Sequence, residues 1–125
     1  MTAEARKKIA VDFLRQAAAG HALRAAEGVL NPGGVHHNVY FAAGWTPLLA
    51  AMDEAAKQAP DHRLDVKHVL CDGDLVAVHS HVVHKAGEPG FAAVHLVRFQ
   101  GEQIAEMWDV ALAIPKDSPN EDGAF

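Results

Sequence analysis

Four side chains in the second half of the chain have the types and spacing needed for proton-transfer chemistry. His79 and His81 lie two residues apart on one predicted strand, and His95 and Asp109 each fall within a later predicted strand. A strand places every second side chain on the same face, so we expect these four to line one face of a small sheet. Three imidazoles and a carboxylate are costly to bury, which favours a functional site.

The pair formed by His95 and Asp109 suits general acid–base catalysis. Two plainer interpretations stay open: Asp109 as a rim carboxylate held by a backbone amide or by Arg98, and His95 as a core histidine with its hydrogen bonds satisfied. The spacing of His79 and His81 also suits a divalent metal ion, with Asp109 or His95 as a third ligand.

A second group of candidate ligand-binding residues lies earlier in the chain. His37 and Asn38 follow a Gly-Gly turn, and both side chains could form hydrogen bonds with a carbonyl ligand. Loop capping by Asn38 is the alternative. Trp45 belongs to an aromatic cluster that suits either a cavity mouth or simple packing of the next helix. The other histidines, among them His62 beside a turn and His84 on the opposite strand parity from His79, are expected to be ordinary.

The composition indicates one folded domain. The chain has 125 residues, 50% of them hydrophobic, and a formal net charge of −5. No block of Lys and Arg points to nucleic acid, and no apolar run approaches the roughly 20 residues that a membrane helix needs. The charged N-terminus lacks a secretory apolar segment, so we expect the cytoplasm. The single cysteine, Cys71, excludes an internal disulfide and a cysteine zinc cluster.

Hydrophobic periodicity predicts helices first and strands afterwards. Helices are expected over 3–19, 21–30 and 46–58, a short extended piece over 35–40, and strands over 62–71, 74–84, 91–99 and 103–113. This order predicts an α+β domain in residues 1–114, with helices on one face of a curved antiparallel sheet of four or more strands. Residues 115–125 are expected to form an extended tail.

The two faces of the predicted sheet differ in character. Odd-numbered positions combine alanines with the imidazoles and Asp109, as a cavity wall would, whereas even-numbered positions are bulky and apolar. Because both faces are apolar, we expect the outer one to pack against a second copy of the chain, with Trp108 buried there. The grouping depends on strand register, since a one-residue bulge would turn Asp109 away from His95.

Several stretches together resemble the SnoaL-like polyketide cyclase group of the nuclear transport factor 2-like superfamily. They are residues 35–38 (VHHN), 73–81 (GDLVAVHSH), 94–99 (VHLVRF), 104–110 (IAEMWDV) and the tail 114–125. The resemblance implies a cone-shaped half-barrel with a deep pocket, commonly dimeric, in which a strand Asp acts as acid/base, a His assists, and no metal or cofactor takes part. His95 and Asp109 match that pair in order and spacing, and His37-Asn38 matches a pocket-lining element. Met107 departs from the pattern, because many relatives carry His there.

Three functional hypotheses follow. The first is a cofactor-independent lyase, isomerase or cyclase-like (aldol-type) enzyme for a small carbonyl compound, in which Asp109 removes a proton and His95 polarises the oxygen. The ligand-orienting and wall residues would be His37, Asn38, Trp45, His79, His81 and Met107. The second is a non-catalytic small-molecule-binding dimer, and the third is a divalent-metal site on His79 and His81.

Overall fold

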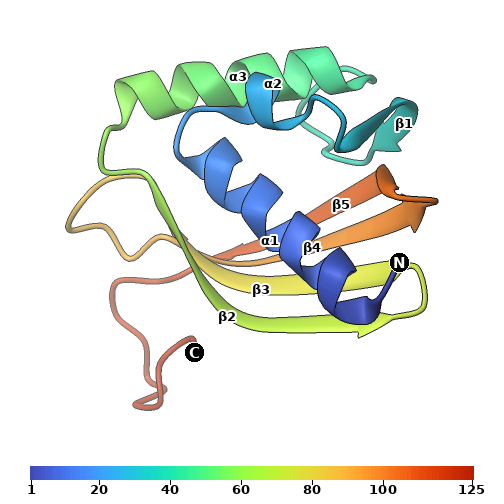
Figure 1. Ribbon diagram of the computed structural model, residues 1–125. Coiled ribbons are helices and arrows are strands. Elements are labelled where there is room, and N and C mark those ends of the chain that lie inside the picture. Colours follow the sequence, from blue (N-terminus) through green and yellow to red (C-terminus); the bar gives the residue numbers. More distant parts are fainter.

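The predicted α+β architecture is confirmed by a computed structural model that describes all 125 residues. Three helices pack on one face of a curved, unclosed sheet of five strands (Figure 1). The elements are α1 (Ala3–Ala18), α2 (Ala22–Ala25), β1 (Leu30–His36), α3 (Trp45–Gln58), β2 (Arg63–Asp72), β3 (Leu75–Val83), β4 (Phe91–Gln100) and β5 (Gln103–Ala113). We call the sheet face under the helices the inner face and the opposite one the outer face.

Four strands form the predicted antiparallel meander, and a fifth extends it. The strand order is β1-β5-β4-β3-β2, with β1 parallel to β5. The prediction of a helix to residue 30 and a turn at 31–34 is wrong, because those turn residues lie inside β1 as a bulge between Leu30 and Val35. Gly34 permits this close approach, since a Cβ there would lie 2.6 Å from the carbonyl oxygen of Ala105 and 2.8 Å from Trp45 Cζ2.

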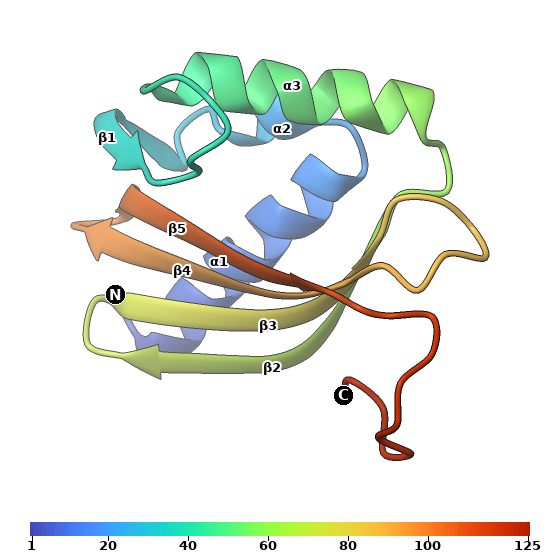
Figure 2. The same ribbon diagram turned by 180° about the vertical axis from the view of Figure 1, so that it is seen from behind.

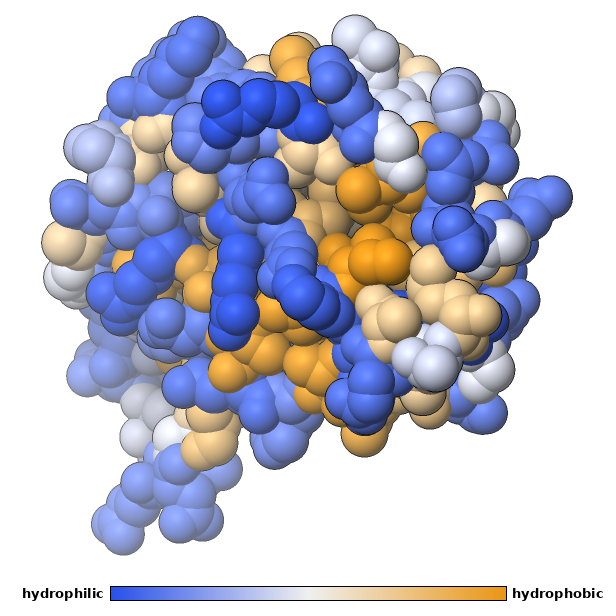
Figure 3. All heavy atoms as spheres, viewed as in Figure 1, coloured by the Kyte–Doolittle hydropathy of each residue, from blue (hydrophilic) through white to orange (hydrophobic).

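The long helix α1 covers the inner face because its apolar residues recur every three or four positions. Thr2 caps its start, the Oγ1 atom accepting a 3.1 Å hydrogen bond from the amide of Ala5. Figures 1 and 2 show α1 crossing the sheet while α2 and α3 lie above it. The space-filling view from the α1 side shows apolar surface flanking the hydrophilic exposed side of this helix (Figure 3). The buried residues of α1 are Ala10, Phe13, Leu14, Ala17 and Ala18.

The register of β4 and β5 places His95 directly opposite Asp109, which confirms that these two share a face. A bulge produces this pairing. At the turn Gln100 pairs with Gln103, a register that would set His95 against Trp108, but the ladder shifts by one residue between Phe99 and Arg98 and brings Asp109 opposite instead. A one-residue bulge was expected to turn Asp109 away from His95, but in the structure the bulge is what brings the two residues opposite each other.

The register of β3 and β4 contradicts the predicted grouping of the histidines. Val78 pairs with His95, whereas His79 pairs with Val94 and His81 with Ala92. Directly opposed residues share a face, so the prediction that His79 and His81 line one face with His95 is wrong. The reason is the β3–β4 connection, whose length sets odd positions of β3 against even positions of β4.

The last residues form a tail without helix or strand, which leaves β5 on the side away from the helices (Figure 2). The ring of Phe125 lies 4.8 Å from that of His81 and 5.5 Å from that of His79. The tail therefore covers these two outer-face imidazoles. None of the helices combines the length and apolar character needed to cross a membrane.

Candidate active site

The principal candidate site is a cavity of about 380 Å³ between the inner face, α3, the end of α1 and the segment that follows β1. Thirteen of its eighteen lining residues are hydrophobic. Such a cavity has the size and lining of a small-molecule site, in which a few polar groups fix the ligand's orientation. The five polar residues are Asn38, His62, His84, His95 and Asp109.

The Asp109 carboxylate is held on one side and free on the other. Its Oδ2 atom accepts a 2.8 Å hydrogen bond from Asn38 Nδ2, while its Oδ1 atom is buried and has no hydrogen-bond partner within the protein. His95 Nε2 lies 3.9 Å from this Oδ1, which is too long for a hydrogen bond. A buried acceptor without a partner costs free energy, so this oxygen is well suited to bind or deprotonate a ligand.

The environment of His95 favours the neutral imidazole. Burial lowers the pKa of His95, and the Asp109 carboxylate beside it offsets only part of that effect. The Nδ1 atom of His95 is also buried without a partner in the protein. A neutral imidazole keeps one N–H, so His95 can donate a hydrogen bond to an oxygen of a ligand.

The segment after β1 aims Asn38 at Asp109. The amide of Asn38 donates to His36 Nδ1 at 3.1 Å, and His36 Nε2 then donates to the carbonyl oxygen of Ala42 at 3.0 Å. Asn38 Oδ1 accepts from the amide of Tyr40 at 3.1 Å, which leaves its Nδ2 group to donate to the carboxylate. The predicted ligand-binding residue Asn38 thus lines the cavity, and it also positions Asp109.

His37 lies outside the cavity, contrary to the prediction. Its amide donates to the carbonyl oxygen of Met107 at 2.9 Å, continuing the β1–β5 ladder, so its side chain points to the outer face. There Nε2 donates to Glu106 Oε2 at 2.6 Å, and the ring stacks on Trp108 with centroids 5.1 Å apart. The hydrogen bonds from His37 and then from Arg98 lower the pKa of Glu106.

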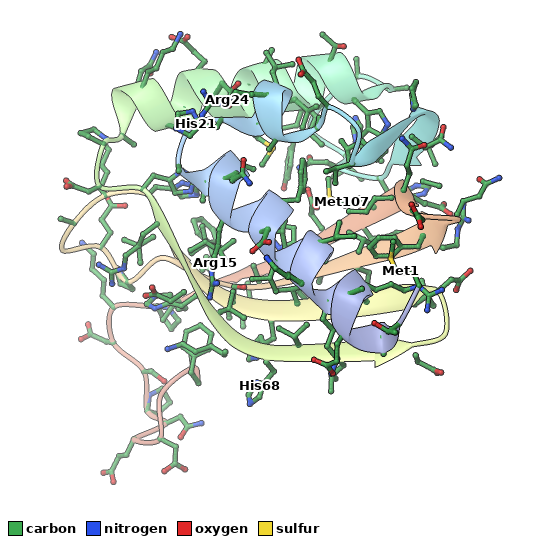
Figure 4. All side chains as sticks on the ribbon, in the orientation of Figure 1. Met1, Arg15, His21, Arg24, His68 and Met107 are labelled. Atoms are coloured by element: carbon green, nitrogen blue, oxygen red, sulfur yellow. The ribbon has the colours of Figure 1, made fainter.

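Trp45 and Met107 do not line the cavity either, and belong to the core. They are 9% and 2% exposed, and Trp45 Nε1 donates a 2.7 Å hydrogen bond to the carbonyl oxygen of Asn31. Figure 4 shows Met107 pointing from β5 toward the helices. The prediction that these two form the apolar wall is wrong, because α3 and α1 supply that wall.

His79 and His81 lie on the outer face, away from the cavity. His79 Nδ1 is 3.0 Å from Nδ1 of His68, a residue that Figure 4 shows on the side of β2 facing away from α1. His81 Nε2 donates to the carbonyl oxygen of Pro89 at 2.7 Å. No group of three or more His, Cys, Asp or Glu side chains is placed to hold a metal ion, so the proposed site on these two histidines lacks a third ligand.

Sequence reasoning missed two histidines that line the cavity, His62 and His84. Their ring centroids are 4.7 Å apart, and His84 lies edge-on to Phe91 at 5.3 Å. Burial lowers the pKa of His62, and the neighbouring His84 lowers it further. The signal was in the hairpin: Arg63 pairs with Val83, so the residues just outside this pair, 62 and 84, meet at the end of the two strands.

Comparison with known proteins gives the family. Residues 10–107 match the model of the SnoaL-like domain. The chain belongs to the SnoaL-like family. The cone of helices on a curved sheet is the fold of this family within the nuclear transport factor 2-like superfamily. The match ends two residues before Asp109, so the assignment does not depend on the candidate catalytic carboxylate.

Solved structures of several other proteins share this fold at low sequence identity. A SnoaL-like protein of unknown function from Burkholderia thailandensis has a TM-score of 0.70 at 17% identity, covering 90% of this chain and 99% of that one. IdmH of Streptomyces antibioticus, a proposed polyketide cyclase, has a TM-score of 0.63 at 17% identity, covering 85% of this chain and 91% of that one. AclR of Streptomyces galilaeus, a proposed hydroxylase, has a TM-score of 0.68 at 23% identity, covering 89% of this chain and 91% of that one. No curated protein sequence matches the chain.

Proposed function

We propose that this SnoaL-like protein is a cofactor-independent acid–base enzyme of the lyase, isomerase or aldol-type cyclase class, acting on a small, largely apolar carbonyl compound. One observation carries the proposal: a buried carboxylate oxygen, Asp109 Oδ1, lacks a partner in the protein and lies beside the imidazole of His95 in an apolar cavity. Lowering of the His95 pKa supports an imidazole that acts as a neutral hydrogen-bond donor.

In the proposed reaction Asp109 Oδ1 removes a proton from the carbon next to the ligand's carbonyl. The electron pair of that C–H bond forms a C=C bond, and the carbonyl π electrons move to the oxygen, which becomes an enolate. The N–H of His95 donates to this oxygen and stabilises its charge. In a conjugated ligand the extended enolate then takes the proton back from Asp109 at a different carbon, the C=O bond re-forms and the C=C bond is shifted. In the aldol-type case the enolate carbon attacks a second carbonyl, the first C=O bond re-forms, and the proton held by Asp109 passes to the alkoxide formed.

Asn38 has a supporting role in this scheme. Its hydrogen bond to Asp109 Oδ2 fixes the carboxylate and leaves Oδ1 as the oxygen without a partner in the protein. General acid–base catalysis of this kind contributes on the order of 10²–10⁴-fold in rate. A polyketide cyclase activity, as proposed for IdmH, agrees with such chemistry. AclR is a proposed hydroxylase with a similar fold, so the fold alone does not fix the reaction.

The proposal is tested by separating binding from turnover. Small carbonyl compounds are first screened for thermal stabilisation of the protein, and those that bind are assayed for conversion by the wild type and by Asp109→Asn. We expect Asp109→Asn to bind the same compounds and to lose conversion. Binding compounds that the wild type never converts would favour the alternative of a non-catalytic binding protein.

We further propose that the protein forms a homodimer through its outer face. The support is a set of exposed apolar side chains on that face, each 40% exposed or more. Trp108 is half-buried and would be covered in the dimer. Light scattering at micromolar concentration should give twice the mass of the monomer. The variant Leu112→Glu, which places a charge on the proposed interface, should give the mass of the monomer. The exposed residues are Leu70, Leu75, Val110 and Leu112.

A further inference from the structure

The cavity has a second polar region besides Asp109 and His95. His62 and His84 line the same cavity, with ring centroids 4.7 Å apart, and His62 Nδ1 is buried without a hydrogen-bond partner in the protein. His84 is an exposed residue, and its ring meets that of Phe91 edge-on with centroids 5.3 Å apart. His62 therefore offers a ring nitrogen with no partner in the protein, beside a second imidazole that can donate a hydrogen bond.

This region lies at the far end of the cavity from Asp109. Val78 is the cross-strand partner of His95, and His84 follows it by six positions along the chain. At about 3.3 Å per residue this corresponds to roughly 20 Å of backbone, shortened by the curvature of the sheet. Between the two ends the wall is apolar, formed by side chains such as Val82 and Ala93. The cavity therefore matches a long molecule with a polar group at each end.

The two ends differ in charge. The Asp109 carboxylate repels an anion, whereas neither His62 nor His84 carries negative charge and each can donate a hydrogen bond. An anionic group of a ligand is therefore directed to the histidine end of the cavity. A carboxylate fits this region best, because its two oxygens can accept from both rings at once.

We propose that His62 and His84 form a carboxylate-binding subsite, so that the ligand is an elongated apolar carbonyl compound with an acidic group at the end away from Asp109. This inference rests on the proposed function only in taking the cavity as the ligand site. Binding of the carboxylate at His62 and His84 requires no turnover at Asp109.

The test uses two probes that differ only in this group, para-acetylbiphenyl and its para′-carboxylate, with affinities measured by calorimetry. The wild type should bind the carboxylate at least about tenfold more tightly, the effect of one charge-assisted hydrogen bond. The double variant His62→Phe/His84→Phe keeps the aromatic shape and should lose this preference while still binding the neutral probe. His68→Phe, which removes an imidazole outside the cavity, is the matched control and should behave as wild type.

A measurement on the unaltered protein guards against misfolding of the double variant. In NMR spectra the ring-proton resonances of His62 and His84 should shift when the carboxylate probe is added and should stay unchanged when para-acetylbiphenyl is added. The proposal is overturned by equal affinities for the two probes, by no binding of either, by a preference that survives in the double variant, or by unshifted resonances. Asp109→Asn separates it from the proposed function, because that variant should lose proton transfer and keep the carboxylate preference.

Discussion

Replacement of Asn38 gives a quantitative prediction about the support of Asp109. Asn38→Ala removes the 2.8 Å hydrogen bond to Asp109 Oδ2 and the 3.1 Å bond from the amide of Tyr40. A hydrogen bond to a charged group contributes about 1.5–3 kcal/mol, and the half-buried position of Asn38 lets water replace part of it. We therefore expect the free energy of unfolding to fall by about 1–2 kcal/mol in urea denaturation at pH 8.

Asn38→Asp provides the sharper comparison, because it replaces the donor with a second carboxylate. Two like charges about 4 Å apart repel by about 4 kcal/mol at an effective dielectric constant of 20, which is an upper estimate for this partly exposed pair. Asn38→Asp should thus be less stable than Asn38→Ala at pH 8 and should recover as the pH falls, since a shared proton removes the repulsion. Equal stability of the two variants at pH 8, or no recovery in acid, would refute the contact between residue 38 and Asp109.

Three further predictions follow from the structure. Because burial lowers the pKa of His95, the unfolded chain binds more protons than the folded one below about pH 6.5, so the free energy of unfolding should fall from about pH 7.5 to 5.5, and less steeply in His95→Gln. Trp45→Phe loses the hydrogen bond to Asn31 and should cost about 0.5–1.5 kcal/mol in urea denaturation without changing ligand affinity, in contrast to a wall residue. Gly34→Ala forces a Cβ against the carbonyl oxygen of Ala105 and should destabilise the protein by about 1–3 kcal/mol, seen as a lower melting temperature.

The order of the helices and of the four meander strands, and the place of His95 and Asp109 on neighbouring strands, could be predicted from the sequence. Alternation with a period of two marks the strands, and the last hairpin is short enough that both residues fall on neighbouring strands. Their exact opposition could not be derived, because it depends on the bulge between Phe99 and Arg98. A bulge leaves little trace in the hydrophobic pattern, since Ala105 is buried much as its neighbour Ile104 is.

The placement of His79 and His81 could not be predicted because it depends on how the β3–β4 connection closes. Gly90 has a φ of +78°, and a Cβ there would collide with the carbonyl oxygen of Val82, so the pairing of Val82 with Phe91 needs a glycine at this point. The sequence shows the glycine but not the register that it permits.

Strand β1 and the orientation of His37 could not be predicted for a different reason. Pro and Gly within residues 31–34 are typical of a turn, yet tertiary contact with β5 draws them into a bulged strand. Once β1 runs beside β5, alternation sends His36 inward and His37 outward. The contact with β5 thus overrides the turn propensity of residues 31–34, in the strand that leads to Asn38 at the cavity.

The most direct test of the proposed chemistry is proton exchange on a carbonyl probe in heavy water. Proton NMR would follow loss of the methyl-ketone signal of para-acetylbiphenyl with wild-type protein and with Asp109→Asn. We expect exchange above the uncatalysed rate with the wild type and only background exchange with Asp109→Asn, although both proteins bind the probe. Exchange at the same rate with both proteins, or none above background with the wild type, would contradict the role given to Asp109.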